Sequence, residues 1–343
     1  MNNFFDSLYD ALGITTVIDS LKTKESIIDT DSEIAKEDET YHSEQIEPVK
    51  FDYTPQTLDD YIGQDAAKAR IRTYIKKVKT IKPVHLVVSG TRGHGKSTIV
   101  YIICNMLGVE PDTYVGGSFT IDNLKTFLQK NSEDNKLHVL FLDEIHSLSK
   151  EVSEYMLPLL KSFVMPEGNQ KVKPFLMMGA TTNLEILQNS SAPFLDRCDL
   201  LELDHYNSHD IKTILKNYND KLYKKNINEE VYDLLSINIR YNPRTTLSAF
   251  DDFIIEENIE TVLKGRQVIK DGLTTKDLIV LKHLAEIKSP VGNEVLAIIT
   301  NQTKASYKDL QEPYLLQYGY ISRKSRGRVI TEKGLKLLSE LQV

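Results

Sequence analysis

The residues best suited to chemistry lie in a glycine-rich run, GTRGHGKS, that extends from Gly90 to Ser97. Its spacing fits the pattern G-x-x-x-x-G-K-S/T, in which backbone N–H groups hold phosphates at the N-terminus of the following helix. The ammonium group of Lys96 would bridge the β- and γ-phosphates, and the Ser97 hydroxyl would be a ligand of Mg²⁺. The residues expected to contact a nucleotide here are Gly93, His94, Gly95, Lys96, Ser97 and Thr98.

An acidic pair, Asp143 and Glu144, follows an apolar run from Leu137 to Leu142. Because parallel strands present residues to a ligand at their carboxyl ends, both acids are expected beside the phosphates. Asp143 would hold Mg²⁺ through water and Glu144 would polarise the attacking water, which with a lysine supplies much of what phosphoryl transfer needs. The two motifs together predict an enzyme that binds and hydrolyses a nucleoside triphosphate. The imidazoles of His94 and His146 are not needed as ligands, and we interpret both as ordinary polar neighbours.

The elements that must position these residues follow from the alternation of apolar runs with helical stretches. Strands are predicted near 85–89, 113–115, 138–142, 175–180 and 200–203. Over 51–205 this pattern predicts an α/β fold with a doubly wound, five-stranded parallel sheet and the phosphate loop after its first predicted strand. Apolar residues then recur at helical spacing over 206–270, which predicts a small helical lid domain.

The last part of the chain, 271–343, has a different pattern. Three helices are predicted at 277–286, 294–299 and 307–318, and apolar strands around Ile321 and Val329 are joined by a turn at Gly327. Three helices and a hairpin predict a winged-helix domain. Its wing would carry four cations able to reach DNA phosphates or the minor groove, although a basic hairpin can also be no more than a solvated face. These cations are Arg323, Lys324, Arg326 and Arg328.

The net charge of −7 is concentrated in the first fifty residues. Residues 1–50 hold 12 acidic against 4 basic side chains, whereas the remainder holds 37 against 38. This composition predicts an acidic, mostly disordered arm, which would leave the rest of the chain free to bind DNA. Its first dozen residues place Phe4, Phe5, Leu8, Tyr9 and Leu12 on one helical face, as in a short amphipathic peptide. Such a peptide could dock on a partner protein or pack on the chain's own surface.

Targeting signals and metal-binding cysteines are not predicted. The chain has no apolar run long enough to cross a membrane and no signal-peptide pattern at its start. Cys104 and Cys198 are the only cysteines, and neither a disulfide nor a zinc site is expected of them. We therefore expect a cytoplasmic protein that does not contact a membrane.

Six segments, in order, resemble the RuvB family, hexameric AAA+ ATPases that drive branch migration of Holliday junctions in bacteria. The resemblance covers roughly 53–340, and its last segment is the most specific because few AAA+ proteins carry a winged helix of this sequence. The six are TPQTLDDYIGQ (54–64), LFLDEIHSLS (140–149), MGATTN (178–183), FLDRCDLLELDHY (194–206), NPRTT (242–246) and EPYLLQYGYISRKSRGRVIT (312–331).

The resemblance implies roles for residues that spacing alone does not assign. Thr182 matches sensor 1, which helps to orient the water, although Asn183 could serve instead. Arg197 matches the arginine finger that reaches a neighbouring subunit's site, although it could pair locally with Asp196. Arg244 matches sensor 2, which reports the state of the phosphates to the lid.

The resemblance also implies contacts to the base and to DNA. Tyr61, Ile62 and Tyr206 match positions that enclose the adenine and ribose, although Tyr206 could be only a core residue. Arg323 and Arg328 match wing residues implicated in DNA contact. The segment from Lys161 to Pro174 leaves little room for the longer hairpin that the family docks on RuvA, so that partner is in question.

The sequence thus predicts a divergent RuvB-type motor, such as a bacteriophage homologue, in a bacterial cell or infected host. It would assemble as a ring, as a hexamer by the resemblance, on duplex or branched DNA and use ATP and Mg²⁺ to drive branch migration in recombination and repair. The alternatives are a AAA+ helicase or clamp loader in replication, and a DNA-binding regulator that uses ATP only to assemble.

Overall fold

The computed structural model describes residues 53–80, 83–168, 170–240 and 242–341. The predicted acidic arm and its amphipathic peptide lie outside these residues. The chain divides into two compact units. The first, here called the ATPase unit, contains Tyr53–Lys221 and Asn242–Arg244, and the second, here called the winged-helix unit, contains Leu222–Tyr241 and Thr245–Val343.

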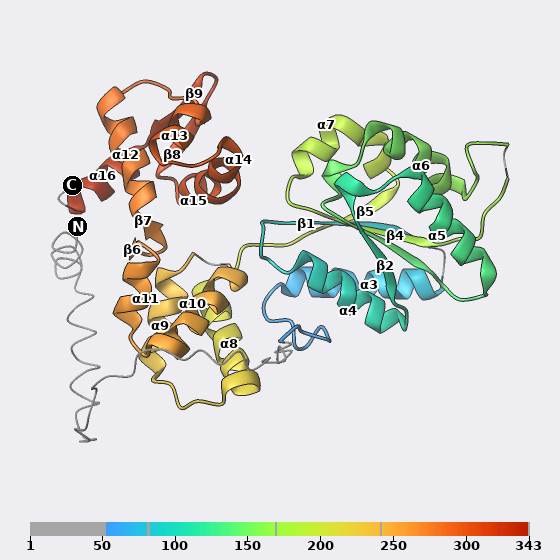
Figure 1. Cartoon of the computed structure of the whole chain (residues 1–343), viewed down its shortest axis with the longest axis horizontal. Coiled ribbons are helices and arrows are strands. Elements are labelled where there is room, and N and C mark those ends of the chain that lie inside the picture. Colours follow the sequence, from blue (N-terminus) through green and yellow to red (C-terminus); the bar gives the residue numbers. More distant parts are fainter. Residues whose placement is uncertain (1–52, 81–82, 169, 241, 342–343) are drawn as a thin grey trace, which may run out of the picture. The chain divides into compact units, whose positions relative to one another are not determined.

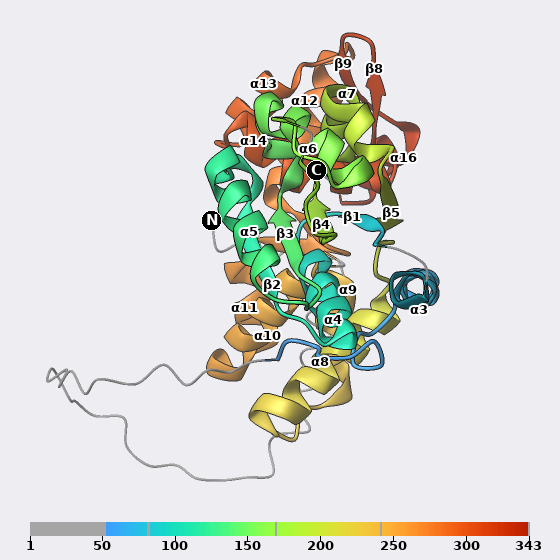
Figure 2. The same ribbon diagram turned by 90° about the vertical axis from the view of Figure 1, so that its right-hand side faces the viewer.

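The ATPase unit is built on a parallel five-stranded sheet. The strands are β1 (His85–Ser89), β2 (Pro111–Val115), β3 (Val139–Asp143), β4 (Leu176–Thr181) and β5 (Cys198–Glu202). Their order, β2-β3-β4-β1-β5, can be followed from left to right in Figure 2. All four pairings are parallel, with Val87 opposite Gly179 in β4 and Leu200 in β5. The predicted fold class and strands are confirmed.

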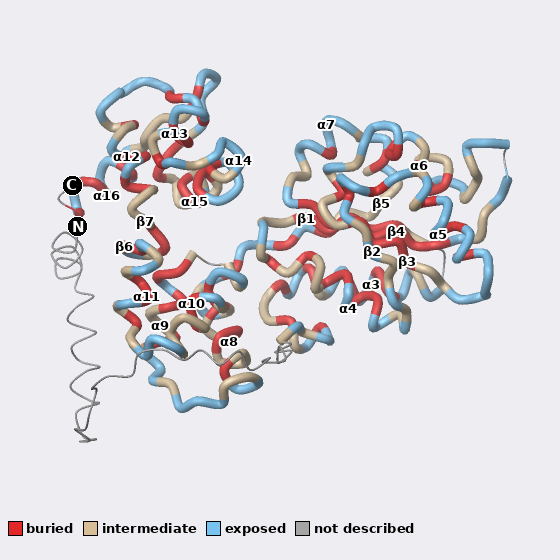
Figure 3. Tube along the Cα trace, in the orientation of Figure 1, coloured by how far each residue is buried: buried red, intermediate tan, exposed pale blue. Residues whose placement is uncertain are grey.

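Helices cover both faces of this sheet because alternate strand residues point to opposite sides. In β4, Leu176 and Met178 pack with α3 (Asp65–Thr80) and α4 (Lys96–Leu107). The intervening Met177 packs on the opposite side with α5 (Ile121–Glu133), α6 (Lys150–Ser162) and α7 (Leu184–Leu195). Figure 1 shows the two helical layers, and Figure 3 shows that the central strands are buried. The sheet is therefore a rigid support for the loops at its carboxyl edge.

The chain after β5 is helical, as predicted. Helix α8 (Ser208–Tyr218) and the first residues of the π-helix η3 (Asn219–Tyr223) belong to the ATPase unit, whereas α9 (Glu229–Asn238) and α11 (Ile259–Gly265) belong to the other. Helix α10 (Pro243–Glu256) starts in the ATPase unit and continues in the winged-helix unit. The limits of a separate lid domain at 206–270 thus stay a prediction.

The winged-helix fold is present in the second unit. After the short strands β6 (Val268–Lys270) and β7 (Leu273–Thr274) come α12 (Thr275–Ile287), α13 (Asn293–Ile299), α14 (Lys304–Ser306), η4 (Tyr307–Gln311), α15 (Glu312–Gln317), β8 (Ile321–Lys324), β9 (Gly327–Ile330) and α16 (Glu332–Glu340). The predicted third helix is divided into a π-turn and α15. Pro313 accounts for the restart, because proline lacks an N–H and is suited to the first turn of a helix.

A short hairpin follows α6. Val164 and Lys171 form an antiparallel bridge, and the N–H of Val172 donates to the Phe163 carbonyl at 2.8 Å. Glu167 in its turn accepts from the Tyr155 hydroxyl at 3.0 Å, which ties the turn to α6. The segment that the sequence analysis judged too short for a long hairpin therefore does form a small one.

Among the described residues no helix is long and apolar enough to span a membrane.

Candidate nucleotide and nucleic-acid sites

The phosphate loop joins the buried strand β1 to α4, and two of its residues need glycine. Gly93 and Gly95 have φ of 84° and 83°, which residues with a side chain rarely adopt. Space is also short, since a side chain at Gly93 would collide with the Asn242 amide and one at Gly95 with the Tyr61 hydroxyl. The loop backbone is therefore held close against two other segments, with the N-terminus of α4 behind it.

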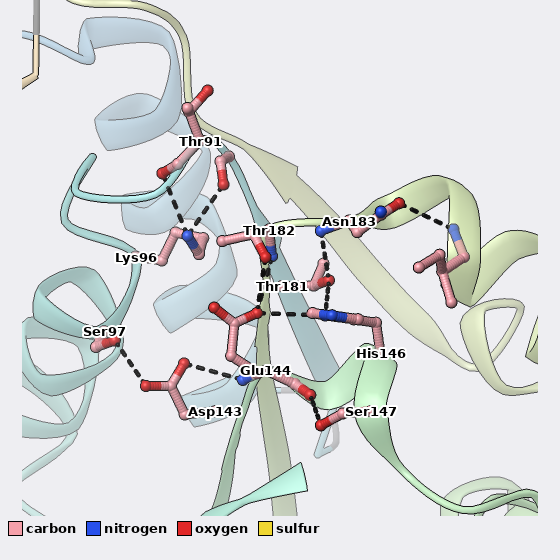
Figure 4. A network of polar contacts seen from close by, with 12 residues as sticks. Thr91, Lys96, Ser97, Asp143, Glu144, His146, Ser147, Thr181, Thr182 and Asn183 are labelled. Atoms are coloured by element: carbon pink, nitrogen blue, oxygen red, sulfur yellow. Dashed lines mark hydrogen bonds and ion pairs between the residues drawn. The ribbon is translucent and has the colours of Figure 1, made fainter. Parts of the chain in front are cut away.

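Lys96 and Ser97 lie at the start of α4, facing the end of β3 (Figure 4). The ammonium group of Lys96 donates to the carbonyls of Gly90 at 3.0 Å and Thr91 at 3.2 Å. Burial lowers the pKa of Lys96, and the carboxylates of Glu144 and Asp143 oppose that effect. The Ser97 hydroxyl donates to Asp143 Oδ2 at 3.3 Å, so two hard oxygen ligands converge where the sequence predicted Mg²⁺.

Glu144 follows β3 in an unusual backbone conformation, with φ 48° and ψ 50°. Such left-handed geometry is costly for a residue with a side chain, and it persists only where the surroundings fix it. Here Ser147 donates its N–H to the Glu144 carbonyl at 2.9 Å, and Asp143 Oδ1 accepts from the Glu144 N–H at 3.0 Å. Gly116 packs so closely on that carbonyl that no side chain would fit. With this backbone conformation, the Glu144 carboxylate reaches Thr182 directly after β4.

Directly after β4, Thr182 makes two hydrogen bonds to the Glu144 carboxylate. Its N–H and its hydroxyl both donate to Oε2, at 3.2 and 2.9 Å. Nδ1 of His146 lies 3.2 Å from the same oxygen and 3.0 Å from the Thr181 hydroxyl. The Asn183 side chain instead caps α7 by accepting from the Ile186 N–H at 3.2 Å. The geometry favours Thr182 over Asn183 as the sensor, and it places His146 in the site.

His94, Tyr61 and Tyr206 form the underside of the phosphate loop. The Tyr61 hydroxyl donates to the His94 carbonyl at 2.7 Å, and the Tyr206 hydroxyl reaches it at 3.5 Å. His94 is 2% exposed, and its imidazole lies edge-on to Tyr206. Burial, with His205 and Lys96 nearby, lowers the pKa of His94 to about 4. His94 is therefore neutral at pH 7, and its carbonyl holds the loop against Tyr61. Ile62, beside Tyr61, is partly exposed.

The two predicted arginines of the ATPase unit lie in separate places. Arg197, between α7 and β5, donates to the Pro193 carbonyl and not to Asp196. Arg244 is exposed in the first turn of α10, and its N–H donates to Asn242 Oδ1 at 3.1 Å. Its charge and that of Arg92 both lower the pKa of Lys96, so Arg244 is near the phosphate loop. The geometry keeps Arg244 with the site and leaves Arg197 outside it.

In the wing, two of the four predicted DNA-binding cations contact a buried carboxylate. Glu312 Oε1 accepts from Arg323 Nε at 3.0 Å and from Arg328 Nε at 2.7 Å, while Oε2 accepts from the Asn293 amide at 3.1 Å. The Glu312 side chain is 1% exposed, that of Arg328 17% and that of Arg323 58%. Lys324 and Arg326 at the tip are exposed. Arg323, Lys324 and Arg326 thus face solvent, whereas Arg328 serves mainly to fix the hairpin.

The sequence analysis missed three residues of these sites. Asn242 donates its amide to the Arg92 carbonyl at 2.5 Å, and Glu312 anchors the wing. Both lie within segments that carry the family resemblance, but neither has a spacing that reveals its partner. His146 was interpreted as an ordinary neighbour because nothing in the order of residues brings β3 and β4 together at that point.

The comparisons with known proteins agree with this geometry. Residues 53–202 match the family described as the Holliday junction DNA helicase RuvB P-loop domain, and residues 270–339 match the RuvB C-terminal winged helix domain. The RuvB subunit of the Holliday junction branch migration complex from Lactobacillus johnsonii is 32% identical over 317 residues, which cover 85% of this chain and 92% of that protein. The subunit from Acholeplasma laidlawii is 31% identical over 83% of this chain and 90% of its own length.

A solved structure shows the same likeness. The RuvB Holliday junction branch migration motor of Thermotoga maritima superposes with a TM-score of 0.71 at 27% identity, covering 83% of this chain and 98% of that one. The two matched family domains, at 53–202 and 270–339, include the phosphate loop, the acidic pair and the wing. The chain therefore belongs to the RuvB family and is a divergent branch-migration ATPase with a P-loop domain and a winged helix.

Proposed function

We propose that this protein uses the hydrolysis of Mg²⁺-bound ATP to move four-way DNA junctions, with the residue roles given below. The observation that carries the proposal is the group of polar contacts in Figure 4, in which three separate segments meet. Lys96 and Ser97 come from the end of the phosphate loop, Asp143 and Glu144 from the end of β3, and Thr182 from the residue after β4. Such a constellation has the cation, the metal ligands and the water-orienting carboxylate that phosphoryl transfer requires.

ATP would bind through the loop backbone and Lys96. The bonds from Lys96 to the Gly90 and Thr91 carbonyls are to neutral acceptors, so an incoming phosphate oxygen can replace them. Ser97 and Asp143 offer the hard oxygen donors that suit Mg²⁺, which would neutralise charge on the phosphates. Tyr61, Ile62 and Tyr206 would border the adenine and ribose, and Gly93, His94, Gly95 and Thr98 would contribute through the loop and helix backbone.

Glu144 would orient the attacking water. Thr182 and His146 both contact Oε2, and among the described residues Oε1 takes no such contact, so Oε1 is the oxygen assigned to the water. Thr182 would act by fixing the carboxylate. Because this hydrogen bond holds a charged group, we expect its loss to slow turnover by about 10- to 100-fold.

Two arginines would complete the site. Arg244, near Lys96, would report the state of the γ-phosphate. Arg197 would reach the site of a neighbouring subunit, which requires a ring, and we propose a hexamer as in the family resemblance. Stabilisation of transition-state charge by such a residue is worth roughly 10³–10⁵ in rate.

The wing would hold DNA through phosphates, by Arg323, Lys324 and Arg326, with Arg328 keeping the hairpin in place. Contacts of this kind carry little sequence information, which suits a motor that must pass any sequence. A RuvA-like partner is proposed on the family resemblance alone, since the hairpin after α6 is only a small one. The N-terminal peptide would take a separate partner. We place the protein in the bacterial cytoplasm, or in that of an infected host, where its DNA substrate is.

The test is migration of a synthetic four-way junction by the full-length protein with ATP and Mg²⁺, with and without a RuvA protein. Wild type should move the junction, while Lys96→Ala should fail to hydrolyse ATP, and Glu144→Gln should bind ATP without turnover. Both variants should leave junctions in place. ATP hydrolysis without migration under either condition would reject the motor and favour a loader, and function retained by Glu144→Gln would favour a regulator that uses ATP only to assemble.

A further inference from the structure

Helix α3 of the ATPase unit carries a dense positive charge. Its 16 residues hold six basic side chains and one acidic one, for a net charge of +5. Three of the six, Arg72, Lys76 and Lys79, recur at a spacing of four and then three residues, so they lie on one side of the helix. All three are exposed, and we call them the basic stripe. Such a stripe attracts a polyanion unless carboxylates of the protein neutralise it.

The cations on the opposite side of α3 are used within the ATPase unit. Lys77 pairs with Asp199 of β5 at 3.0 Å, and the Arg70 guanidinium donates to the Leu200 carbonyl. Strand β5 is at the edge of the sheet, where backbone groups have no neighbouring strand to pair with. These two cations therefore have a structural use, which the basic stripe does not share.

The basic stripe has little neutralisation from its surroundings. Arg72 lies 3.4 Å from Asp59 Oδ1, and the two side chains are 54% and 92% exposed. Lys79 donates to a neutral acceptor, the Met106 carbonyl, at 3.1 Å. Lys76 forms no hydrogen bond or ion pair with the part of the chain that the structure describes. Because exposed ion pairs and bonds to carbonyls are weak, a charged acceptor can replace them.

A segment of the opposite charge belongs to the same chain, within the acidic arm that precedes Tyr53. Residues 29–47, here called the acidic segment, hold eight carboxylates and one lysine, for a net charge of −7. Three of the carboxylates are consecutive, at 37–39. The acidic segment therefore has more than enough charge to neutralise the basic stripe.

The course of the chain brings the arm close to α3. Tyr53 is fixed in the ATPase unit, where its hydroxyl donates to the Ile214 carbonyl at 3.2 Å. Six residues later Asp59 contacts Arg72, so the Cα atoms of Tyr53 and Asp59 are at most about 22 Å apart. The acidic segment ends only six residues before Tyr53. A tether this short gives an effective concentration on the order of millimolar, at which several weak charge pairs act together.

From these observations we infer that the acidic segment docks on the basic stripe of α3 in the same molecule. It occupies the place that a nucleic-acid backbone would otherwise take, so the arm keeps α3 from binding DNA without regard to sequence. The wing remains open to DNA, and residues 1–15 remain open to a partner. The inference goes beyond the proposed motor function and does not depend on ATP turnover.

The first test measures how fast a small acylating reagent modifies Lys76 in the full-length protein. The comparison is with a variant whose segment is partly neutralised by Glu37→Gln, Asp38→Asn and Glu39→Gln, and peptide mass spectrometry follows each lysine separately. We expect Lys76 to react about threefold faster in the variant, and the difference to vanish at about 0.5 M NaCl because salt screens exposed charges. Lys161, an exposed lysine of α6 on the other face of the sheet, should react equally fast in both proteins.

A second test detects the contact itself. A zero-length carbodiimide reagent joins a carboxylate to a lysine that touches it, so it should link the acidic segment to Lys79 in the wild type. Lys76→Glu should reduce this product severalfold, and folding should be unaffected because Lys76 has no partner in the described chain. The matched control is Lys161→Glu, which should leave the product unchanged. The yield should not vary with protein concentration, because the contact is intramolecular.

Three results would overturn the inference. Equal acylation of Lys76 in the wild type and in the neutralised variant would leave the basic stripe as a solvated face. Protection of Lys76 that survives neutralisation and rises with protein concentration would assign the stripe to a second copy of the chain. Protection by added duplex DNA that is equal in both proteins would make it a DNA site that the arm does not cover.

The inference instead predicts that DNA protects Lys76 in the neutralised variant and much less in the wild type. None of these measurements uses ATP. Failure of the protein to move junctions would therefore count against the motor alone, whereas failure of the arm to protect Lys76 would count against docking alone.

Discussion

Lys96 in the phosphate loop and Arg328 in the wing are both largely buried cations, but they are held in opposite ways. Lys96 donates to two neutral carbonyls, whereas Arg328 donates to the full charge of Glu312, itself buried. A charge–charge bond is stronger and harder to exchange than a bond to a carbonyl. The comparison indicates that a cation destined for a ligand is kept with replaceable partners, and that a cation that shapes the protein is neutralised permanently.

The largest effect should come from Lys96→Ala. ATP turnover should fall by about 10³-fold or more, since the variant has no charge aimed at the transferred phosphate. Thermal stability should hardly change, because only bonds to carbonyls are removed and burial already disfavours the charge. Steady-state hydrolysis and a melting curve measure both, with Lys79→Ala as control, since Lys79 also donates to a carbonyl, that of Met106. A large drop in melting temperature with Lys96→Ala would contradict the comparison.

The opposite pattern is expected for Glu312→Gln. Removing the charge leaves Arg328 buried beside a neutral amide, which should destabilise the winged-helix domain by about 2–4 kcal/mol, while ATP hydrolysis without DNA is retained. Amide hydrogen exchange of α12 and α15, measured at increasing urea concentration, shows whether the loss of stability lies in the winged-helix domain. The matched control is Glu294→Gln, in which an exposed acid of the same domain is separated from the charge of its partner Lys304 and stability should be unchanged. Equal behaviour of the two variants would show that burial of Glu312 has no special role.

Acid should affect the ATPase unit first. His85 accepts from the Met177 N–H and lies 3.1 Å from the Leu160 carbonyl, and burial lowers its pKa to about 4, as it does for His94. Between pH 6.5 and 4 the unfolded imidazoles bind protons that the folded ones do not. Stability therefore falls as pH falls through this window, by up to about 3 kcal/mol for each histidine.

Hydrogen exchange at pH 7.5, 6 and 5 would measure this. Protection of β1 and β4 should fall toward pH 5 more steeply than protection of α12. His85→Gln, which keeps a donor and an acceptor but cannot titrate, should flatten the slope in the ATPase unit. An unchanged slope in that variant would show that other groups dominate.

The sequence could predict features that have a local signal, but not those that depend on which side chains meet in the fold. The phosphate loop, the acidic pair and all five strands of the sheet were predicted because their signals are local: a fixed spacing of glycine and lysine, and apolar runs of strand length. The partners of Asn242 and His146 were not, because the Arg92 carbonyl and the Thr181 hydroxyl lie far from them in the chain. The pairing of Glu312 with Arg323 and Arg328 was not predicted either, because charge pattern alone does not show which of the wing's cations turns inward to a buried carboxylate. The π-turn before α15 was missed because Pro313 restarts the helix within an otherwise continuous apolar pattern.

The smallest effect expected concerns the wing tip, where the cations are exposed. Lys324→Ala with Arg326→Ala should leave folding intact and reduce the slope of log affinity against log salt by about 2 on duplex DNA, because each side chain neutralises one phosphate. Lys336→Ala, which removes an exposed cation of α16, should leave the slope unchanged. A salt titration of DNA binding measures this. If the double variant kept the full slope, the tip would be only a solvated face, and DNA binding would have to come from Arg323 or from another surface of the protein.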